Sequence, residues 1–128
     1  RREGLPSPVI TPSDVMREAE RRMATMAFMG HTFQFDAASQ VNIAGAGMLA
    51  LAAIIAGSQP NDFRWASPAS DFSWIDASNT SVLLDAQSMW TFAQAAAAWK
   101  REHIFAARAI KDLVPIPPDY AADSRWPH

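Results

Sequence analysis

Three histidines are the residues of this chain that could serve acid–base or metal chemistry, and they stand far apart in the sequence. His103 lies in a long helical pattern, and the adjacent Glu102 points to another face of that helix. A catalytic histidine needs a carboxylate that orients it, and a metal site needs several converging ligands. We therefore expect His103 to be a buried or interface residue, His31 a solvated turn residue and His128 a disordered terminal residue.

The carboxylates are scattered along the chain, and most have a local structural role open to them. Thr11 with Asp14, and likewise Asp36 and Asp85, precede helical patterns, where short polar side chains accept hydrogen bonds from the first free backbone N–H groups. Asp76 begins a segment that lacks the glycine and glutamate of a calcium loop, so a turn is expected. A paired-carboxylate hydrolase site needs two of these groups close together, which their spacing does not predict.

Glycine and serine give no nucleotide-binding or nucleophile motif. Gly45 and Gly47 lie inside a helical stretch without the Lys-Ser or Lys-Thr of a phosphate loop, and we expect a glycine there to let another helix approach closely. No G-x-S-x-G frame surrounds Ser39 or Ser88. The chain has no cysteine, which excludes disulfides, zinc thiolate sites and thiol nucleophiles. We predict no catalytic residue, cofactor or metal, and hence no enzyme.

The composition is that of one folded domain. The chain has 128 residues, of which 49% are apolar, so it can bury a core without metal or disulfide help. A net charge of −2 and the lack of a basic stripe argue against nucleic-acid binding. The longest apolar run, residues 43–56, is shorter than the roughly 20 residues that span a bilayer, so membrane insertion is not expected.

Two near-matching passages, residues 33–40 and 82–89, each run from a short strand into a helix capped by an aspartate. Apolar periodicity and turn residues predict three helices over residues 11–27, 36–56 and 86–114, hairpins over 28–35 (with its turn at Gly30-His31) and 72–84, and an edge strand over 61–66. The predicted fold is α+β, with three helices packed on a small antiparallel sheet made of two hairpins.

Proline and composition divide the chain into three parts. Residues 1–10 contain two prolines and are expected to be a linker or lead-in, and residues 11–114 form the single α+β domain. Prolines end the last helix, so residues 115–128 are expected to be an irregular tail that exposes Tyr120 and Trp126.

Apolar side chains repeat with 4–3 spacing along the last predicted helix, like the seam of a coiled coil. The residues of this seam that we expect to contact a partner are Phe92, Trp99, His103, Ile110 and Leu113. A second apolar stripe, Met16, Ala19, Met23 and Met26, runs along the first helix. Together with the apolar helical run of residues 43–56, these two faces are a lot of apolar surface for a small domain, which predicts self-association as a dimer or trimer.

Three blocks of the chain carry a family resemblance. Residues 28–46 read F-x-G-x-x-F-x-F-D-x-x-S-Q-x-N-I-x-G-A, residues 74–84 read W-I-D-x-x-N-x-x-V-x-L, and residues 105–111 read F-A-A-R-x-I-K. In this order and spacing the blocks resemble a phage and prophage domain catalogued as a domain of unknown function, DUF4376. The resemblance covers about residues 12–114.

The resemblance implies a tail- or tail-fibre-associated protein of a bacteriophage or prophage, located in the virion tail or in the host cytoplasm during assembly. Its implied partners are other phage tail proteins, and residues 1–10 would join the domain to an upstream module. The family supplies no catalytic residues. Two alternatives stay open: a tail-fibre assembly chaperone that binds a fibre tip and leaves, and a fragment of a cell-wall hydrolase or other enzyme.

Overall fold

The computed structural model describes residues 9–128 and has the predicted α+β fold. Its elements, in chain order, are α1 Pro12–Arg22, β1 Thr25–Phe28, β2 His31–Gln34, α2 Ala37–Ile55, β3 Ser73–Ile75, β4 Ser81–Leu83, α3 Ala86–Lys111 and the short 3₁₀ helix η1 Asp123–Arg125. Residues 1–8 lie outside the described part, so only the last two residues of the expected lead-in are seen.

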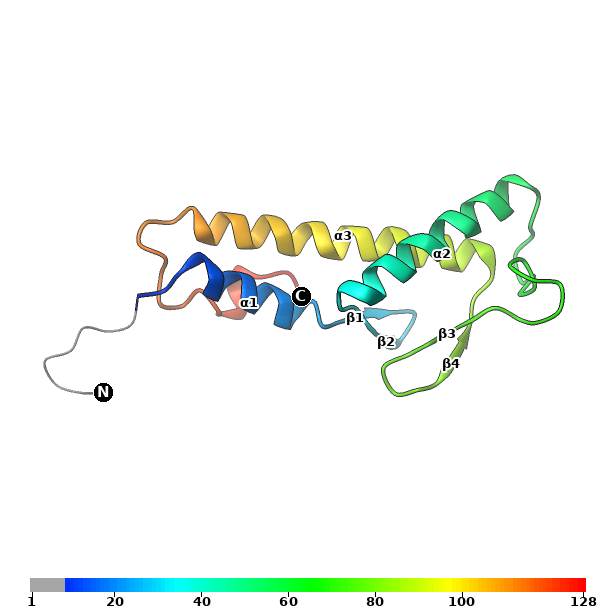
Figure 1. Cartoon of the computed structure of the whole chain (residues 1–128), viewed down its shortest axis with the longest axis horizontal. Coiled ribbons are helices and arrows are strands. Elements are labelled where there is room, and N and C mark those ends of the chain that lie inside the picture. Colours follow the sequence, from blue (N-terminus) through cyan, green and yellow to red (C-terminus); the bar gives the residue numbers. More distant parts are fainter. Residues whose placement is uncertain (1–8) are drawn as a thin grey trace, which may run out of the picture.

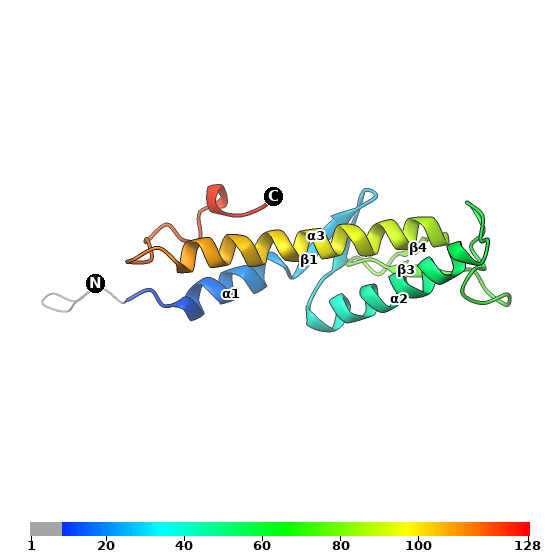
Figure 2. The same ribbon diagram turned by 90° about the horizontal axis from the view of Figure 1, so that it is seen from above.

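The long helix α3 is the axis of the molecule. Helix α1 runs antiparallel to its C-terminal half and α2 antiparallel to its N-terminal half (Figures 1 and 2). Both hairpins lie below α3 in the view of Figure 1, and the C-terminal tail returns beside α1 and α3. The molecule is therefore elongated along α3.

Each helix begins at the N-cap that the sequence predicts. Thr11 and Asp14 form a reciprocal capping box at the start of α1. Asp36 and Asp85 each accept a hydrogen bond from the backbone N–H of the serine three residues further on. The carboxylate of Asp85 also accepts the backbone N–H of Asn61 at 2.9 Å, so this cap ties a loop to the start of α3.

The first hairpin starts earlier than predicted. Helix α1 ends at Arg22, not near residue 27, and the two-residue turn is Met29-Gly30, not Gly30-His31. Met29 and Gly30 have φ values of 51° and 74°, which suit a two-residue hairpin turn. Met26 is buried, as the apolar stripe predicts, but it lies on β1, opposite Phe33. Cross-strand pairing here overrides a helical pattern that local propensity alone would extend.

The sheet also differs from the prediction. The hairpins form two separate two-stranded sheets, which are linked by a hydrogen bond from Ala77 N–H to the carbonyl of Thr32 at 2.7 Å. Residues 61–66 form turns instead of an edge strand. Trp65 is half-buried there and its indole N–H donates to the Leu84 carbonyl at 2.9 Å. Side-chain anchoring to the strand–helix junction therefore replaces strand pairing.

Phe92 of α3 lies at the centre of the core, where both hairpins meet it. Its ring centroid lies 4.7 Å from that of Phe33 and 4.9 Å from that of Phe28 in the first hairpin. Trp74 of the second hairpin meets the same ring edge-on at 6.2 Å. Phe92 and Phe33 are fully buried, so this cluster fixes both hairpins against α3.

Helices α2 and α3 approach each other closely at Gly47. A Cβ atom added at Gly47 would stand 2.3 Å from the Cβ of Ala93, whereas one added at Gly45 would meet nothing within 4 Å. Gly47 therefore has the helix-approach role that the sequence predicts for this pair of glycines, and Gly45 does not have it within this chain.

We expect Gly47→Ala to destabilise the fold by about 1–3 kcal/mol, the usual cost of overpacking. Gly45→Ala is the matched control, and we expect it to stabilise the monomer by about 0.4–1 kcal/mol because it restricts only the unfolded chain. Adding Ala93→Gly to Gly47→Ala should recover part of the loss. Urea unfolding at low micromolar concentration measures all three, and wild-type stability of Gly47→Ala would contradict the close approach.

Candidate functional site

The predicted seam lies on the inner face of α3. Phe92, His103 and Ile110 are buried, and Trp99 is half-buried. Leu113 lies beyond the last residue of α3 and is exposed. The chain's own hairpins and tail cover most of these side chains, so the apolar surface that is open to a partner lies elsewhere.

His103 is enclosed by two tryptophans. Its ring centroid lies 4.3 Å from that of Trp99 and 6.2 Å from that of Trp126. Its Nδ1 lies 2.7 Å from the carbonyl oxygen of Trp99, which makes Nδ1–H the donor. Nε2 is buried and has no hydrogen-bond partner among the described residues. The imidazole thus has a packing position with one satisfied nitrogen and no carboxylate hydrogen-bonded to it.

The C-terminal tail is ordered against the helices, contrary to the expectation that it exposes its aromatic residues. Trp126 is only 3% exposed, and its indole N–H donates to the Tyr120 carbonyl at 2.8 Å. Tyr120 is half-buried. His128, expected to be disordered, has Nδ1 3.0 Å from the Trp126 carbonyl. Trp126 packs beside His103 with its polar N–H satisfied, so the indole can be buried.

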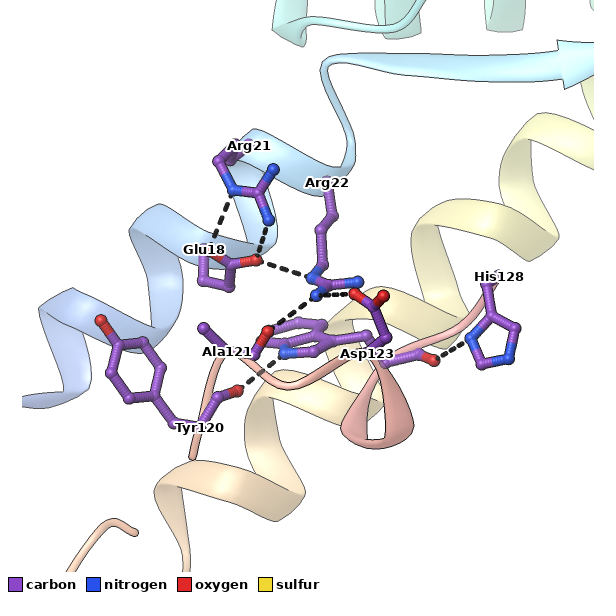
Figure 3. Close-up of polar contacts among 8 residues, drawn as sticks. Glu18, Arg21, Arg22, Tyr120, Ala121, Asp123 and His128 are labelled. Atoms are coloured by element: carbon purple, nitrogen blue, oxygen red, sulfur yellow. Dashed lines mark hydrogen bonds and ion pairs between the residues drawn. The ribbon is translucent and has the colours of Figure 1, made fainter. Parts of the chain in front are cut away.

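Arg22 joins α1 to this tail, in an arrangement that we call the C-terminal clasp: Glu18, Arg22, Ala121, Asp123 and Trp126 (Figure 3). Its guanidinium donates to Glu18 at 2.7 Å, to the Ala121 carbonyl at 2.8 Å and to Asp123 at 2.7 Å, and it lies 5.6 Å from the Trp126 ring centroid. Hydrogen bonds from Arg21 and Arg22 lower the pKa of Glu18, and Arg22 lowers the pKa of Asp123. The clasp is therefore an ionised network.

His31 is not a free turn residue, because it joins the two hairpins through Asp76. Its Nδ1 lies 3.1 Å from Asp76 Oδ2. Asp76 is buried, and its Oδ1 accepts the backbone N–H groups of Ser78 and Thr80 and the Ser78 hydroxyl. The Thr80 N–H is the main cause that lowers the pKa of Asp76 to about 2, with Ser78 and His31 adding to it.

A histidine–aspartate pair is one component of acid–base catalysis, so its geometry matters for function. The Ser78 hydroxyl donates to the carboxylate of Asp76 at 2.9 Å, whereas a nucleophilic serine donates to the histidine. Within residues 9–128, no three histidine, aspartate or glutamate side chains converge as metal ligands do. The contacts of Asp76 are those of a turn, which is the interpretation that the sequence favoured.

A large apolar surface on α2 is not covered by any part of residues 9–128. We call it the α2 outer face: Val41, Gly45, Met48, Ala52 and Ile55. Val41 is 72% exposed, Met48 65% and Ile55 79%. No segment lies beyond α2 on the side away from α3 in Figure 2. The sequence predicts apolar surface on this helix but not which side is exposed, because α2 is apolar all round and gives no periodicity to show which side is buried.

Two further properties of α2 bear on what could cover it. By length and composition it could cross a membrane, since its most apolar 18-residue stretch has a mean hydropathy of 1.6. The expectation of no membrane insertion is based on the length of residues 43–56 alone, but the residues of α2 that precede them are also uncharged. At its N-terminal end the face continues into a groove of about 310 Å³ against α3, lined by Val41, Phe35 and Lys100 among others.

The clasp predicts a difference between two neighbouring arginines. The Arg22 side chain is 12% exposed and that of Arg21 67%, yet both pair with Glu18. We expect Arg22→Ala to cost about 2 kcal/mol, the size of a hydrogen bond to a charged group, and to speed carboxypeptidase trimming of the tail. Arg21→Ala should cost under about 0.5 kcal/mol. Equal effects in urea unfolding and trimming would contradict the clasp.

Asp76 predicts a specific acid dependence. Its folded pKa of about 2 lies below the ordinary 3.8, so the carboxylate stabilises the fold above about pH 4 and loses this effect as the pH falls towards 2. We expect Asp76→Asn to be less stable than wild type at pH 7 and the difference to shrink between pH 4 and 2. Unfolding midpoints measured from pH 2 to 7 test this, and a constant difference would count against it.

The comparisons with known proteins give a family and no function. A family model described as a domain of unknown function (DUF4376) matches residues 13–124, from α1 into η1. No curated protein and no solved structure matches the chain significantly. The matched span covers most of the chain and includes all three of the sequence blocks described above. The chain therefore belongs to the DUF4376 family of domains of unknown function.

Proposed function

We propose that this chain is a non-catalytic interaction module of a bacteriophage or prophage tail protein, acting in the virion or during assembly in the host. The α2 outer face carries the proposal. The side chains of Val41, Met48 and Ile55 are exposed to water, because no part of the described chain packs on them. Covering apolar surface is favourable by about 25 cal/mol per Å², so a partner that buries this face gains affinity from it.

The phage tail setting is supported by the resemblance of the three sequence blocks to phage and prophage domains. A tail component keeps its partner, while an assembly chaperone uses the same kind of face and leaves. An enzymatic role has one specific observation in its favour, the His31–Asp76 pair, and the direction of the Ser78 hydroxyl bond weakens it. Protein–protein contact within the tail, through the α2 outer face, is therefore the function we favour.

The test is made in the phage or prophage that encodes the chain. We expect Met48→Glu to lower incorporation of the protein into purified particles at least tenfold, because a buried charge without a partner opposes docking. Phe105→Glu on α3 is the matched control, since Phe105 is 64% exposed against 65% for Met48. Quantitative mass spectrometry of purified particles gives the copy number.

The outcomes separate the alternatives. A protein that is absent from wild-type particles, but whose Met48→Glu variant still lowers the yield of infectious particles, is an assembly chaperone. Full incorporation of Met48→Glu would show that the α2 outer face is not the docking surface. Loss of incorporation with both Met48→Glu and Phe105→Glu would show that the effect is not specific to α2.

A further inference from the structure

The α2 outer face has the spacing of a helix-pairing seam. Its members are separated by four, three, four and three residues, which places them in one row along the helix. The row is nearly symmetric about Met48: small residues stand on either side of it, and a β-branched residue stands at each end. A helix that pairs with a copy of itself needs this kind of self-complementary row.

Gly45 points to a helix as the occupant. A glycine in a helix interior is destabilising relative to alanine by roughly 0.5–1 kcal/mol. Gly47 has a reason to be glycine in the contact with Ala93, but a Cβ at Gly45 would meet nothing within 4 Å. A second helix that crosses α2 at Gly45 supplies the missing reason, because two backbones approach closely only where side chains are small.

The lack of charge on α2 permits a second copy of this chain as the occupant. None of the 11 lysine and arginine residues and 13 aspartate and glutamate residues of the chain lies in α2. Two copies of a charged face would repel each other, whereas two copies of this face bring no like charges together. A C2 pair buries the same patch on both molecules, which is the commonest arrangement of soluble homo-oligomers.

We propose that a second copy of this chain covers the α2 outer face through an antiparallel α2–α2 pair centred on Met48. This rests on the proposed function in that it names the occupant of the same face. In the antiparallel order Val41 lies opposite Ile55 of the second copy, and Gly45 lies one residue from the position opposite its Ala52, so small side chains stand on both sides of Met48. Antiparallel helices also place their dipoles favourably.

Cysteine cross-linking tests the order of the pair, and the absence of native cysteine makes each introduced thiol unique. A disulfide requires Cα atoms within about 7 Å. Under mild oxidation we expect Met48→Cys to cross-link with itself. A mass-tagged Val41→Cys chain mixed with an Ile55→Cys chain should give mainly the mixed dimer. Phe105→Cys on α3 is the control and should not cross-link.

Sedimentation equilibrium tests the pair without cross-links. We expect wild type and Phe105→Glu to dimerise and Met48→Glu to have a dimer Kd at least tenfold higher. Gly45→Leu is the more discriminating variant. The monomer has space for the leucine side chain, but in the pair this side chain would collide with the crossing helix. The dimer should therefore weaken although the face becomes more apolar. Nonspecific hydrophobic association would strengthen instead. Circular dichroism melts at low concentration check that each variant folds.

Four results would overturn the pair. They are a wild-type monomer at high micromolar concentration, tighter association of Gly45→Leu, preferential Val41–Val41 cross-links as in a parallel pair, or flotation of the wild-type monomer with phosphatidylglycerol vesicles through α2. A monomer whose Met48→Glu variant still loses incorporation into particles removes the pair and keeps the proposed function. If the wild type is a dimer, and the Met48→Glu variant is monomeric but is incorporated normally, the pair is kept and the proposed function is removed.

Discussion

The inner face of α3 is the surface on which the other elements of this domain pack. With 26 residues, α3 is about 39 Å long, which exceeds what either α1 or α2 can cover. The two shorter helices therefore lie along different halves of it, the hairpins meet it at Phe92, and the tail meets it at His103. The shorter helices, both hairpins and the tail therefore all depend on contacts with α3.

Local physical rules were enough to predict the three α-helices, their N-caps and the two hairpins. The caps at Thr11, Asp36 and Asp85 and the two hairpins follow from residue type within a few positions. Contacts between distant segments could not be predicted from the sequence. No local pattern indicates that Arg22 pairs with Asp123 or that His31 pairs with Asp76. The 4–3 periodicity of α3 identified its apolar face but could not tell whether this chain or another covers it.

The two glycines of α2 are close in sequence but differ in environment, since one lies in a core contact and the other on the surface. Gly45 and Gly47 are two residues apart, so they project from different sides of the same helix. Gly47 lies where Ala93 of α3 leaves no space for a Cβ atom, whereas a Cβ atom at Gly45 would meet nothing within 4 Å. One apolar side of α2 therefore packs within the described chain and another is exposed, which is why the sequence of this helix is apolar all round.

The carboxylates of this domain with perturbed pKa values have structural partners. Glu18, Asp76 and Asp123 have lowered pKa values because structural partners donate hydrogen bonds to them. A general acid or base works best with a pKa near the working pH, and these shifts move the carboxyls further from it. Their charge is used to hold the tail and the hairpins in place. Helix α2 carries no charged residue, so a protein that packs along it strips water from no ionised group of this helix.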